Sequence, residues 1–532
     1  MQEERDDQRV RPEPRAGTPA RVQEPIWRRL ASGAREPGWW RHGWPARVRE
    51  AGWWRHGWPA RVREAGWWRR HGWFAGVLAV GAALRALAML GYRPALWFPD
   101  SYTYVVTVFR PRPDLVRPAG YSMFMKLLEP FHGFWAVTAA QHLLGLATGV
   151  LVYVAARRAP RWARTLAAVP VLLDAYQIEL EHLLVSDTLF LFLVVAAVAL
   201  SMTEKRATVA AVGLLLAAAT LTRTVGQPLI VVLAAWFVLR RRVGLAGVLL
   251  VAALVPVVAY GGWFYATYHR VGLVGANGVF LYARTMSFAD CAKMHPPADL
   301  RVLCDPRPPE LRPPSQEYIW SKDSPLVKLP GITFTKANDD LASRFATLAV
   351  TSQPLDYAGS VLAELARTFA WGRPVYPDAE VYAYYEFPAT PPGPPGRYPA
   401  QVGADYAKLY EQGAIGTEIV EPYAGWLRGY QSVVRLPGPV LLALLLAPPV
   451  AAAVRRARGL RHAGPPVWAV PWAAAVVLLV TPPAVAEFDY RYVLPAVPLA
   501  CLAAALSVRP DLRGRSESGK DFGNDIPRNV RL

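Results

Sequence analysis

The sequence predicts an all-α polytopic membrane protein with about ten transmembrane helices and a mixed extracytoplasmic loop domain. Hydrophobic residues make up 53% of its 532 residues, which is above the usual share for a soluble globular protein. They gather in continuous runs, for example at 190–200 and 245–263. A helix needs about 20 mostly apolar residues to span a bilayer. Because the runs do not alternate with polar residues, they favour helices over the strands of a membrane barrel.

The N-terminal segment is polar and ends in a tandem repeat. Its first 35 residues are rich in Pro and Arg, and we expect them to be disordered. A 14-residue unit then occurs at 36–49, at 50–63 and, truncated, at 64–74. Its Trp and Arg residues suit a membrane interface, but near-identical copies also fit a tolerated expansion without function. No cleavable signal peptide is evident, because the first apolar run begins near Trp73.

Ten apolar segments follow, and each is a predicted span. They lie at 73–92, 134–156, 163–180, 186–202, 207–222, 226–239, 244–264, 435–454, 466–483 and 488–507. Basic residues fall in alternate turns between these segments, such as Arg157–Arg158, Lys205–Arg206 and Arg240–Arg242. The positive-inside rule places these turns in the cytoplasm. We therefore expect both termini to be cytoplasmic, in a multi-pass protein of a bacterial inner (plasma) membrane.

This orientation divides the chain into five predicted regions. They are a basic cytoplasmic tail at 1–72, a first membrane part at 73–264 that includes an outer loop at 93–133, an extracytoplasmic domain at 265–434, a second membrane part at 435–510, and a cytoplasmic tail at 511–532. Cys291 and Cys304 share the extracytoplasmic domain, where a disulfide is permitted, and no zinc-ligand spacing is present. The segment 338–371 predicts two helices broken near Pro354, with Asn338 or Asp339 as the first cap.

The net charge of +19 reflects 59 Lys and Arg residues against 40 Asp and Glu residues. Much of this excess flanks the apolar runs, as the positive-inside rule requires, so it does not indicate nucleic-acid binding. The sequence contains no Walker sequence, no dinucleotide-binding GxGxxG and no GxSxG nucleophile elbow in a credible context. We therefore expect a reactive site in the outer turns.

Charged and aromatic side chains gather in four outer turns that are far apart in the sequence. They are Asp100, Tyr102, Arg117 and Tyr121 in the first outer loop, Glu181, His182 and Asp187 after the third span, Arg223 after the fifth, and Asp489, Arg491 and Tyr492 before the last. Charges near bilayer depth are costly, so pairing or function usually explains them. We expect Asp100, Asp187, Arg223 and Arg491 to converge at one site, although outer turns are also polar simply because they face water.

Two further features leave alternatives open. Arg85 lies inside the first predicted span, where it could extend to the membrane surface, pair with an acid or position a lipid phosphate. Glu181, His182 and Asp187 are close enough in sequence for a divalent metal to be conceivable. Their spacing matches no specific metal-ligand motif.

Taken in order, these motifs resemble those of the GT-C superfamily of membrane glycosyltransferases, in particular the protein O-mannosyltransferases and lipid A aminoarabinose transferases. The matching stretches are Asp100 with Tyr102 or Tyr104, RPAGY at 117–121, EHLLVSDTLF at 181–190, LTRT at 221–224 and RYVLPAVP at 491–498. The resemblance covers roughly residues 73–510. The first loop has one acid where the family has an acidic pair, and Thr224 stands where the family has proline.

The resemblance implies transfer of a sugar from a polyprenyl-phosphate carrier to an extracytoplasmic glycan, lipid or protein acceptor. Asp100 would act as general base in an inverting displacement, and Asp187 or Glu181 would orient the acceptor, the base or an ion. Cations would bind the leaving phosphate. The implied substrate-binding residues are Tyr102, Arg117, Tyr121, His182, Arg223, Asp489, Arg491 and Tyr492. Two rival functions stay open from the residues alone, namely a transporter or lipid flippase and a noncatalytic membrane scaffold.

Overall fold

The computed structural model describes residues 65–391, 393, 398–459 and 464–508. The predictions for the N-terminal repeats and for the C-terminal tail therefore lie almost entirely outside the described residues. The first described helix, α4 (Ala65–Gly91), begins before residue 73, where the first span was predicted to start. All contacts below lie within the compact unit Arg69–Leu532.

Within the described residues, five helical segments are long and apolar enough to cross a membrane. They are Trp68–Gly91 in α4, Phe134–Arg158 (α7, Phe134–Ala155, with η3, Ala156–Arg158), α13 (Val243–Tyr268), α22 (Gly438–Ala457), and Tyr490–Ser507 (α24, Tyr490–Val493; η7, Leu494–Ala496; α25, Val497–Ser507). Four apolar segments are shorter, namely α10 (Asp187–Ser201), α11 (Arg206–Thr222), η4 (Thr224–Gly226) with α12 (Gln227–Leu239), and α23 (Ala469–Val485). The described chain is an α-helical, multi-pass membrane protein, whereas ten crossings stay a prediction.

One predicted span is interrupted. In place of a single helix over 163–180, the structure has α8 (Arg161–Leu173) and α9 (Ala175–His182). Asp174 lies between them in an extended conformation, and its carboxylate accepts hydrogen bonds from the backbone N–H groups of Tyr176 at 2.9 Å and Leu436 at 2.7 Å. An aspartate that satisfies free N–H groups in this way starts a new helix. The apolar pattern alone did not reveal this break.

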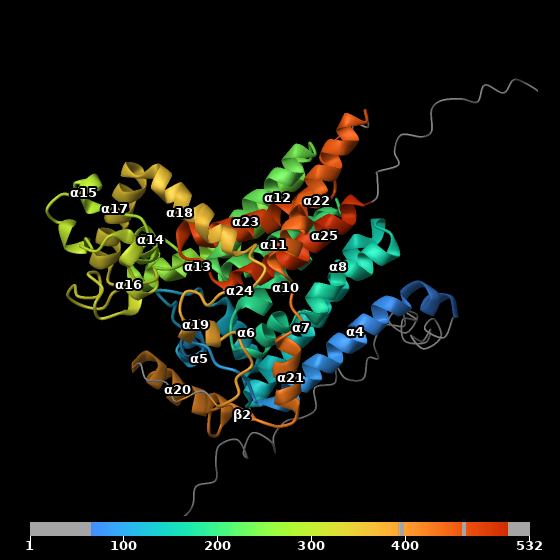
Figure 1. The fold of residues 1–532 in the computed structure, drawn as a ribbon, viewed down its shortest axis with the longest axis horizontal. Helices are drawn as coiled ribbons and strands as arrows, with labels where there is room; N and C mark the ends of the chain where they lie inside the picture. The colour runs from blue at the N-terminus through green and yellow to red at the C-terminus, as the bar shows by residue number, and fades with distance from the viewer. Residues whose placement is uncertain (1–64, 392, 394–397, 460–463, 509–532) are drawn as a thin grey trace, which may run out of the picture. The chain divides into compact units, whose positions relative to one another are not determined.

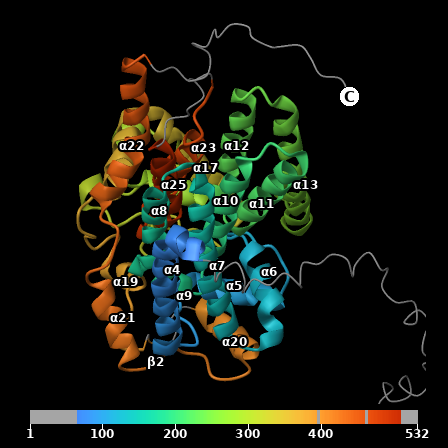
Figure 2. The ribbon, with the colours of Figure 1, turned by 90° about the vertical axis from the view of Figure 1, so that its right-hand side faces the viewer.

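The apolar helices pack side by side around a shared core (Figures 1 and 2). Helix α11 packs against α10 and α13, α7 packs against α8 and α10, and α25 packs against α8, α22 and α23. Their contact surfaces bury small and branched side chains such as Val194, Leu216 and Leu249. Because lipid tails are as apolar as these side chains, close packing is what holds such helices together.

The first outer loop is mostly helical and is covered by a distant part of the chain. It contains α5 (Pro99–Phe109), α6 (Gly120–Leu128) and η2 (Glu129–Phe131). Helix α5 packs against α20 (Tyr398–Glu411). The short strand β1 (Tyr92–Arg93) pairs antiparallel with β2 (Glu418–Ile419). The end of the predicted domain at 265–434 therefore folds back over this loop.

The first half of that predicted domain builds its own core. It contains α14 (Asn277–Thr285), α15 (Cys291–Met294), η5 (Arg301–Leu303), η6 (Pro309–Leu311), α16 (Glu317–Trp320) and α17 (Lys336–Ser352). Tyr282 and Phe345 are fully buried there, and the predicted disulfide between Cys291 and Cys304 is present. The second half contains α18 (Pro354–Arg367), α19 (Ala379–Ala383), α20 and α21 (Tyr423–Gln431). It returns to the membrane helices, since α18 packs on α23 and α21 packs on α9.

The predicted break near Pro354 is confirmed, because α17 ends at Ser352 and α18 begins at Pro354. The predicted cap is wrong. Thr335, and neither Asn338 nor Asp339, caps α17, because its hydroxyl accepts a hydrogen bond from the Asn338 N–H at 3.2 Å. A Thr at this position satisfies a free backbone N–H in the first turn, so the helix begins earlier than predicted.

Candidate functional site

Six charged residues from four separate turns meet in one group, which we name the charged cluster. Its members are Asp100, Arg117, Asp187, Arg223, Asp489 and Arg491. Asp100 lies between two cations, because it forms an ion pair with Arg117 and lies 3.4 Å from Nη1 of Arg491. Nε of Arg491 also lies 3.3 Å from the Asp489 carboxylate.

The Tyr492 ring contacts two arginines of the cluster, Arg223 and Arg491. Arg223 forms an ion pair with Asp187, and its guanidinium lies 4.9 Å from the centre of the Tyr492 ring. The Arg491 guanidinium lies 5.0 Å from the same ring. Cations at this distance are attracted to an aromatic face. The four residues that the sequence predicted to converge thus lie in one group, and their chemical roles stay predictions.

Backbone contacts hold the first outer loop against the turn that carries Asp187. Leu96 donates its N–H to the His182 carbonyl at 3.0 Å, and the Leu184 N–H donates to the Leu96 carbonyl at 3.1 Å. The Ser101 hydroxyl, in the first turn of α5, donates to the Leu184 carbonyl at 2.8 Å. These hydrogen bonds therefore fix the start of α5, which carries Asp100, relative to the start of α10, which carries Asp187.

The RPAGY motif brings Arg117 close to Arg223 through a single glycine. A Cβ atom at Gly120 would collide with the backbone carbonyl of Leu221, near the end of α11. Only a residue without a side chain allows this close approach. The first outer loop therefore contacts α11 just before Arg223, which explains why a glycine stands in the motif.

The cluster is electrostatically paired but keeps unused hydrogen-bonding capacity. Burial opposes ionisation of Asp100, but Arg117 and Arg491 outweigh it and hold the pKa of this carboxyl below its usual value. The ion pair of Asp187 lacks hydrogen-bond geometry, so neither carboxylate oxygen of this buried residue accepts a hydrogen bond from the described residues. Nε of Arg491 likewise has no hydrogen-bond acceptor among them. Buried polar atoms in this state are uncommon and suit a polar ligand.

Sequence reasoning missed two aromatic members of the site. The Tyr385 hydroxyl donates to Oδ2 of Asp489 at 2.6 Å, and the Phe98 ring lies 4.4 Å from the Arg491 guanidinium. Phe98 lies two residues before Asp100 in the stretch FPDSYTY, from which only Asp100 and the tyrosines were predicted as site residues. Tyr385 comes from a Pro-rich outer segment, and no local pattern connects it to Asp489.

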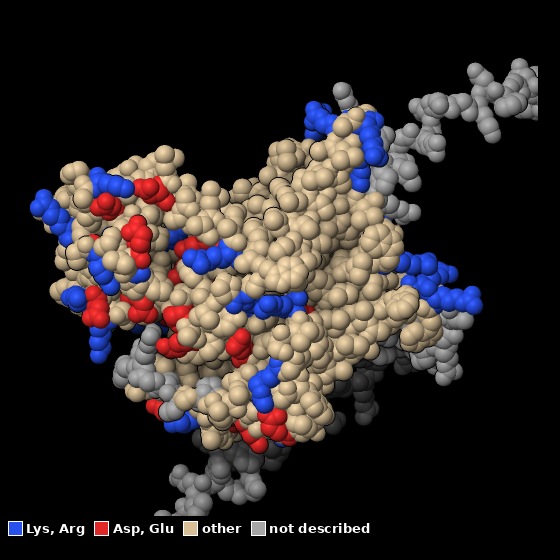
Figure 3. All heavy atoms as spheres, viewed as in Figure 1, with Lys and Arg blue, Asp and Glu red and all other residues tan. Residues whose placement is uncertain are grey.

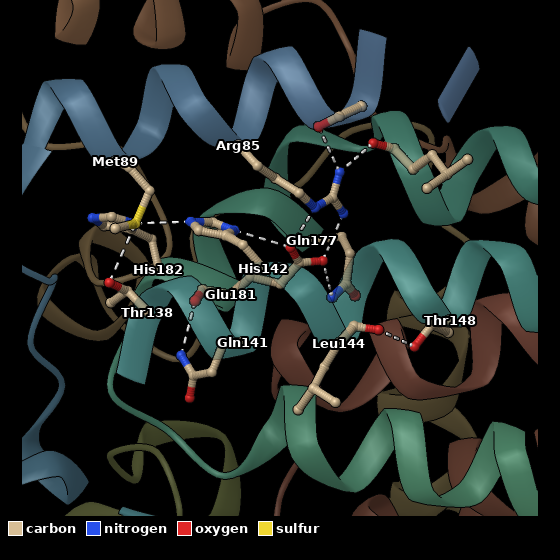
Figure 4. A network of polar contacts seen from close by, with 12 residues as sticks. Arg85, Met89, Thr138, Gln141, His142, Leu144, Thr148, Gln177, Glu181 and His182 are labelled. Carbon is tan, nitrogen blue, oxygen red and sulfur yellow. Dashed lines mark hydrogen bonds and ion pairs between the residues drawn. The ribbon is translucent and has the colours of Figure 1, made fainter. Parts of the chain in front are cut away.

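Glu181 and His182 do not belong to the charged cluster, and they lie in a separate buried network (Figure 4). The Glu181 carboxylate accepts two hydrogen bonds from Arg85, from Nε and Nη2, each at 2.7 Å, and one from Gln177 at 3.1 Å. His182 Nδ1 lies 3.0 Å from Nε2 of His142. Glu181 and His182 thus lie outside the charged cluster, and their predicted roles toward the substrate stay predictions. The ion pair with Glu181 also shows that Arg85 pairs with an acid, which is one of the three alternatives given above.

Tyr121 and Tyr102 support the site from within the protein. Tyr121 is fully buried, and its hydroxyl donates to Oε1 of Gln141 at 2.6 Å. Gln141 in turn donates to the Glu181 and Leu183 carbonyls at 2.8 and 2.7 Å. Tyr121 therefore braces the turn before Asp187 through Gln141, and its predicted role in substrate binding stays a prediction. Tyr102 stacks on Trp97 with ring centres 4.9 Å apart.

The residues predicted as conceivable metal ligands do not fit a divalent ion. No group of three or more His, Cys, Asp or Glu residues in the described part of the chain is arranged to hold one. The ring nitrogens of His182 face His142 and the Tyr92 carbonyl, and Glu181 is paired with Arg85. Asp187 is paired with Arg223.

Glu487, two residues before Asp489, makes the free energy of unfolding depend on pH. Burial, together with the neighbouring carboxylates of Glu364 and Asp489, raises the pKa of Glu487 to about 8. The folded protein then keeps a proton that the unfolded chain releases near its ordinary pKa of about 4.3. Stability therefore falls as the pH rises between these two values, by up to about 1.4 kcal/mol per pH unit.

We expect the Glu487→Gln variant to lose this dependence. The measurement is the thermal unfolding midpoint of the purified protein in detergent at several values between pH 5 and pH 8. The wild-type midpoint should fall more steeply with pH than that of the variant. Parallel curves for the two proteins would contradict the prediction.

The fold and the site define a multi-pass α-helical membrane protein with a cluster of paired acids and arginines at its helix ends. No protein-family model and no curated protein matches the chain. Two matching solved structures are both of ArnT from Cupriavidus metallidurans, one bound to undecaprenyl phosphate and one in the apo state. Each is 16% identical with a TM-score of 0.31, over 82% of this chain and 78% or 76% of the other. ArnT is of the GT-C type that the sequence motifs resemble.

Proposed function

We propose that this chain is a membrane glycosyltransferase that moves a sugar from a polyprenyl-phosphate carrier to an extracytoplasmic acceptor. The observation that carries the proposal is the placement of Asp100 between Arg117 and Arg491. A second ion pair, between Arg223 and Asp187, lies across the Tyr492 ring. An attacking hydroxyl needs a base and a leaving phosphate needs cations. The charged cluster supplies both groups side by side.

The proposed reaction is a single displacement at the anomeric carbon. The acceptor oxygen forms a bond to this carbon while the bond from the carbon to the phosphate oxygen breaks. The bonding electron pair leaves with the polyprenyl phosphate, which gains one negative charge. The hydroxyl proton passes to Asp100, which is already ionised because its pKa is lowered by the two arginines. One displacement inverts the anomeric centre.

The arginines differ in what they can give to the phosphate. Nε of Arg491 is buried and has no hydrogen-bond acceptor among the described residues, so it can donate to a phosphate oxygen without losing an existing hydrogen bond. Its contact with Asp100 is long, at 3.4 Å. A phosphate that draws Arg491 away leaves Asp100 with fewer cations, which raises the pKa of Asp100 and makes it a stronger base. Arg223, whose guanidinium also contacts the Tyr492 ring, binds the same phosphate.

The Asp187 carboxylate can orient the acceptor by accepting a hydrogen bond from it. Its Oδ1 is in ion-pair contact with Arg223, but Oδ2 accepts no hydrogen bond from the described residues, so Oδ2 can accept one from a sugar or lipid hydroxyl. Burial raises the pKa of this carboxyl above its ordinary value, and the ion pair with Arg223 opposes that shift. Orientation of this kind increases the rate of sugar transfer, because the attacking atom is held close to the reacting carbon.

The first experiment compares cells with and without the gene by mass spectrometry of envelope glycans, lipids and glycoproteins. We expect one sugar modification to disappear and its polyprenyl-phosphate donor to accumulate. Unchanged products would overturn the proposal. A transporter or flippase would instead show uptake or flipping that survives Asp100→Ala, and a scaffold would tolerate a combined Asp100→Asn and Arg223→Ala change.

Arg491→Lys is expected to reduce turnover by about 10²- to 10³-fold, the usual cost of removing one preorganised donor from a developing anion. Lysine keeps the charge but lacks the planar guanidinium that contacts Asp100, Asp489 and Tyr492 together. The matched control is Arg344→Lys, an exposed arginine paired with Asp299 at 2.8 Å. Turnover is measured with the donor and acceptor identified above. Equal turnover of Arg491→Lys and wild type would remove Arg491 from the mechanism.

A further inference from the structure

A second group of cations lines a cavity on the side that the basic turns predict to be cytoplasmic. The cavity has a volume of about 390 Å³. It is lined by Arg157, Ala159, Pro160, Arg161, Arg164 and Val508. In Figure 3 the right-hand end of the visible face, where α22 ends and α8 begins, carries Lys and Arg but no Asp or Glu among the described residues. The cavity therefore has three arginines on its wall and lies in a region of one charge sign.

Among the described residues the arginines of this cavity have no acidic partner, and Arg164 is held in place by Tyr153. Nε of Arg164 donates to the Tyr153 carbonyl at 3.1 Å, and its guanidinium lies 4.1 Å from the centre of the Tyr153 ring. Within the described residues, no carboxylate forms an ion pair with Arg157, Arg161 or Arg164. Another basic turn is different, because Arg240 and Arg242 there both pair with Glu204.

Uncompensated arginines around a hollow select an anion. The planar guanidinium binds phosphate oxygens in pairs, and three of them on one wall strengthen the positive potential inside the hollow. The neighbouring Trp162 is 60% exposed, and tryptophan is enriched at the level of lipid headgroups. Ala159, Pro160 and Val508 add apolar surface to the wall. The combination matches a phosphate attached to an apolar group better than a free ion.

We propose that this cavity binds the headgroup of an anionic phospholipid of the cytoplasmic leaflet. The phosphate contacts Arg157, Arg161 and Arg164, and the glycerol and first acyl carbons contact the apolar wall. A lipid bound there fastens the α7–α8 turn to the end of α25, because both segments contribute residues to the wall. The site is independent of the proposed sugar transfer, since none of its residues belongs to the charged cluster.

The test is native mass spectrometry of the full chain in detergent, combined with thermal unfolding midpoints. Phosphatidylglycerol, phosphatidylcholine and free glycerol phosphate are added in separate arms. Wild type should retain one phosphatidylglycerol per chain and unfold at a higher temperature with it, but not with phosphatidylcholine. Removing a basic side chain that contacts the anionic headgroup directly is expected to cost roughly a fivefold change in affinity. The double variant Arg157→Gln, Arg161→Gln should therefore bind phosphatidylglycerol about 25-fold more weakly.

The matched control is the double variant Arg456→Gln, Arg458→Gln, which removes the same charge from exposed positions at the end of α22. It should bind phosphatidylglycerol like wild type. Equal weakening in both double variants would overturn the proposal, because total charge and not the cavity would then determine binding. Stabilisation by free glycerol phosphate equal to that by the lipid would also overturn it, since the site would then take a soluble phosphate.

Discussion

The Asp100→Asn variant of the full chain is expected to lose about 10²- to 10⁴-fold of its transfer rate, the range that a general base contributes. Asparagine preserves the shape of the side chain and can still accept hydrogen bonds from Arg117 and Arg491, but it cannot take the hydroxyl proton. The lowered pKa of Asp100 means that the wild-type base is ionised throughout the neutral range. The measurement is the rate of product formation from the polyprenyl-phosphate donor, with the thermal midpoint recorded on the same samples.

The control for this variant is Asp405→Asn on α20, the helix that packs against α5. Its side chain is 77% exposed and touches only Lys408 in the described contacts. We expect this variant to retain wild-type rates. If Asp100→Asn folds normally and retains them as well, Asp100 is not the base and the proposed reaction is wrong.

The largest expected effect on stability comes from the Arg85–Glu181 pair. Both side chains are almost fully buried, with 2% and 0% exposure. Replacing Arg85 by Met leaves the Glu181 carboxylate without its cation, and breaking a buried pair in this way costs about 3 to 5 kcal/mol. The free energy of unfolding can be measured by equilibrium denaturation of the protein in mixed detergent micelles. We expect the same loss for Glu181→Leu, because it leaves the arginine unpaired.

The double variant Arg85→Met, Glu181→Leu should recover part of this loss. An apolar pair of similar volume is often as stable as the buried ion pair that it replaces, although His142 and Gln177 each lose a partner here. Lys336→Met serves as control, because its ion pair with Asp340 is exposed and worth at most about 1 kcal/mol. Additive losses in the double variant would show that the two side chains do not act as a pair.

Gly145 shows why this pair depends on the packing of the bundle. A Cβ atom at this position would collide with the Glu181 carboxylate. The missing side chain on α7 thus makes the space that Glu181 occupies when it reaches Arg85 on α4. Nothing in the sequence near Gly145 announces this, because Arg85 and Glu181 are 96 residues apart.

Local patterns determined much of the fold because they act over a few residues. Continuous apolar runs predicted the helices, a proline predicted the break before Pro354, and two nearby cysteines predicted the disulfide. Failures came where one polar side chain changed the outcome. Asp174 ended a predicted span by capping a new helix, and Thr335 capped α17 ahead of the expected residues.

By itself the sequence determined that several turns deliver charges to one side of a helical membrane protein, because charge and apolarity alternate along the chain. Only the tertiary structure decided which charges meet. Asp187 faces Arg223 in the charged cluster, whereas Glu181 and His182, a few residues earlier, turn into the bundle toward Arg85 and His142. The physical reason is that a side chain's partner depends on the rotation and packing of its helix, which distant residues set.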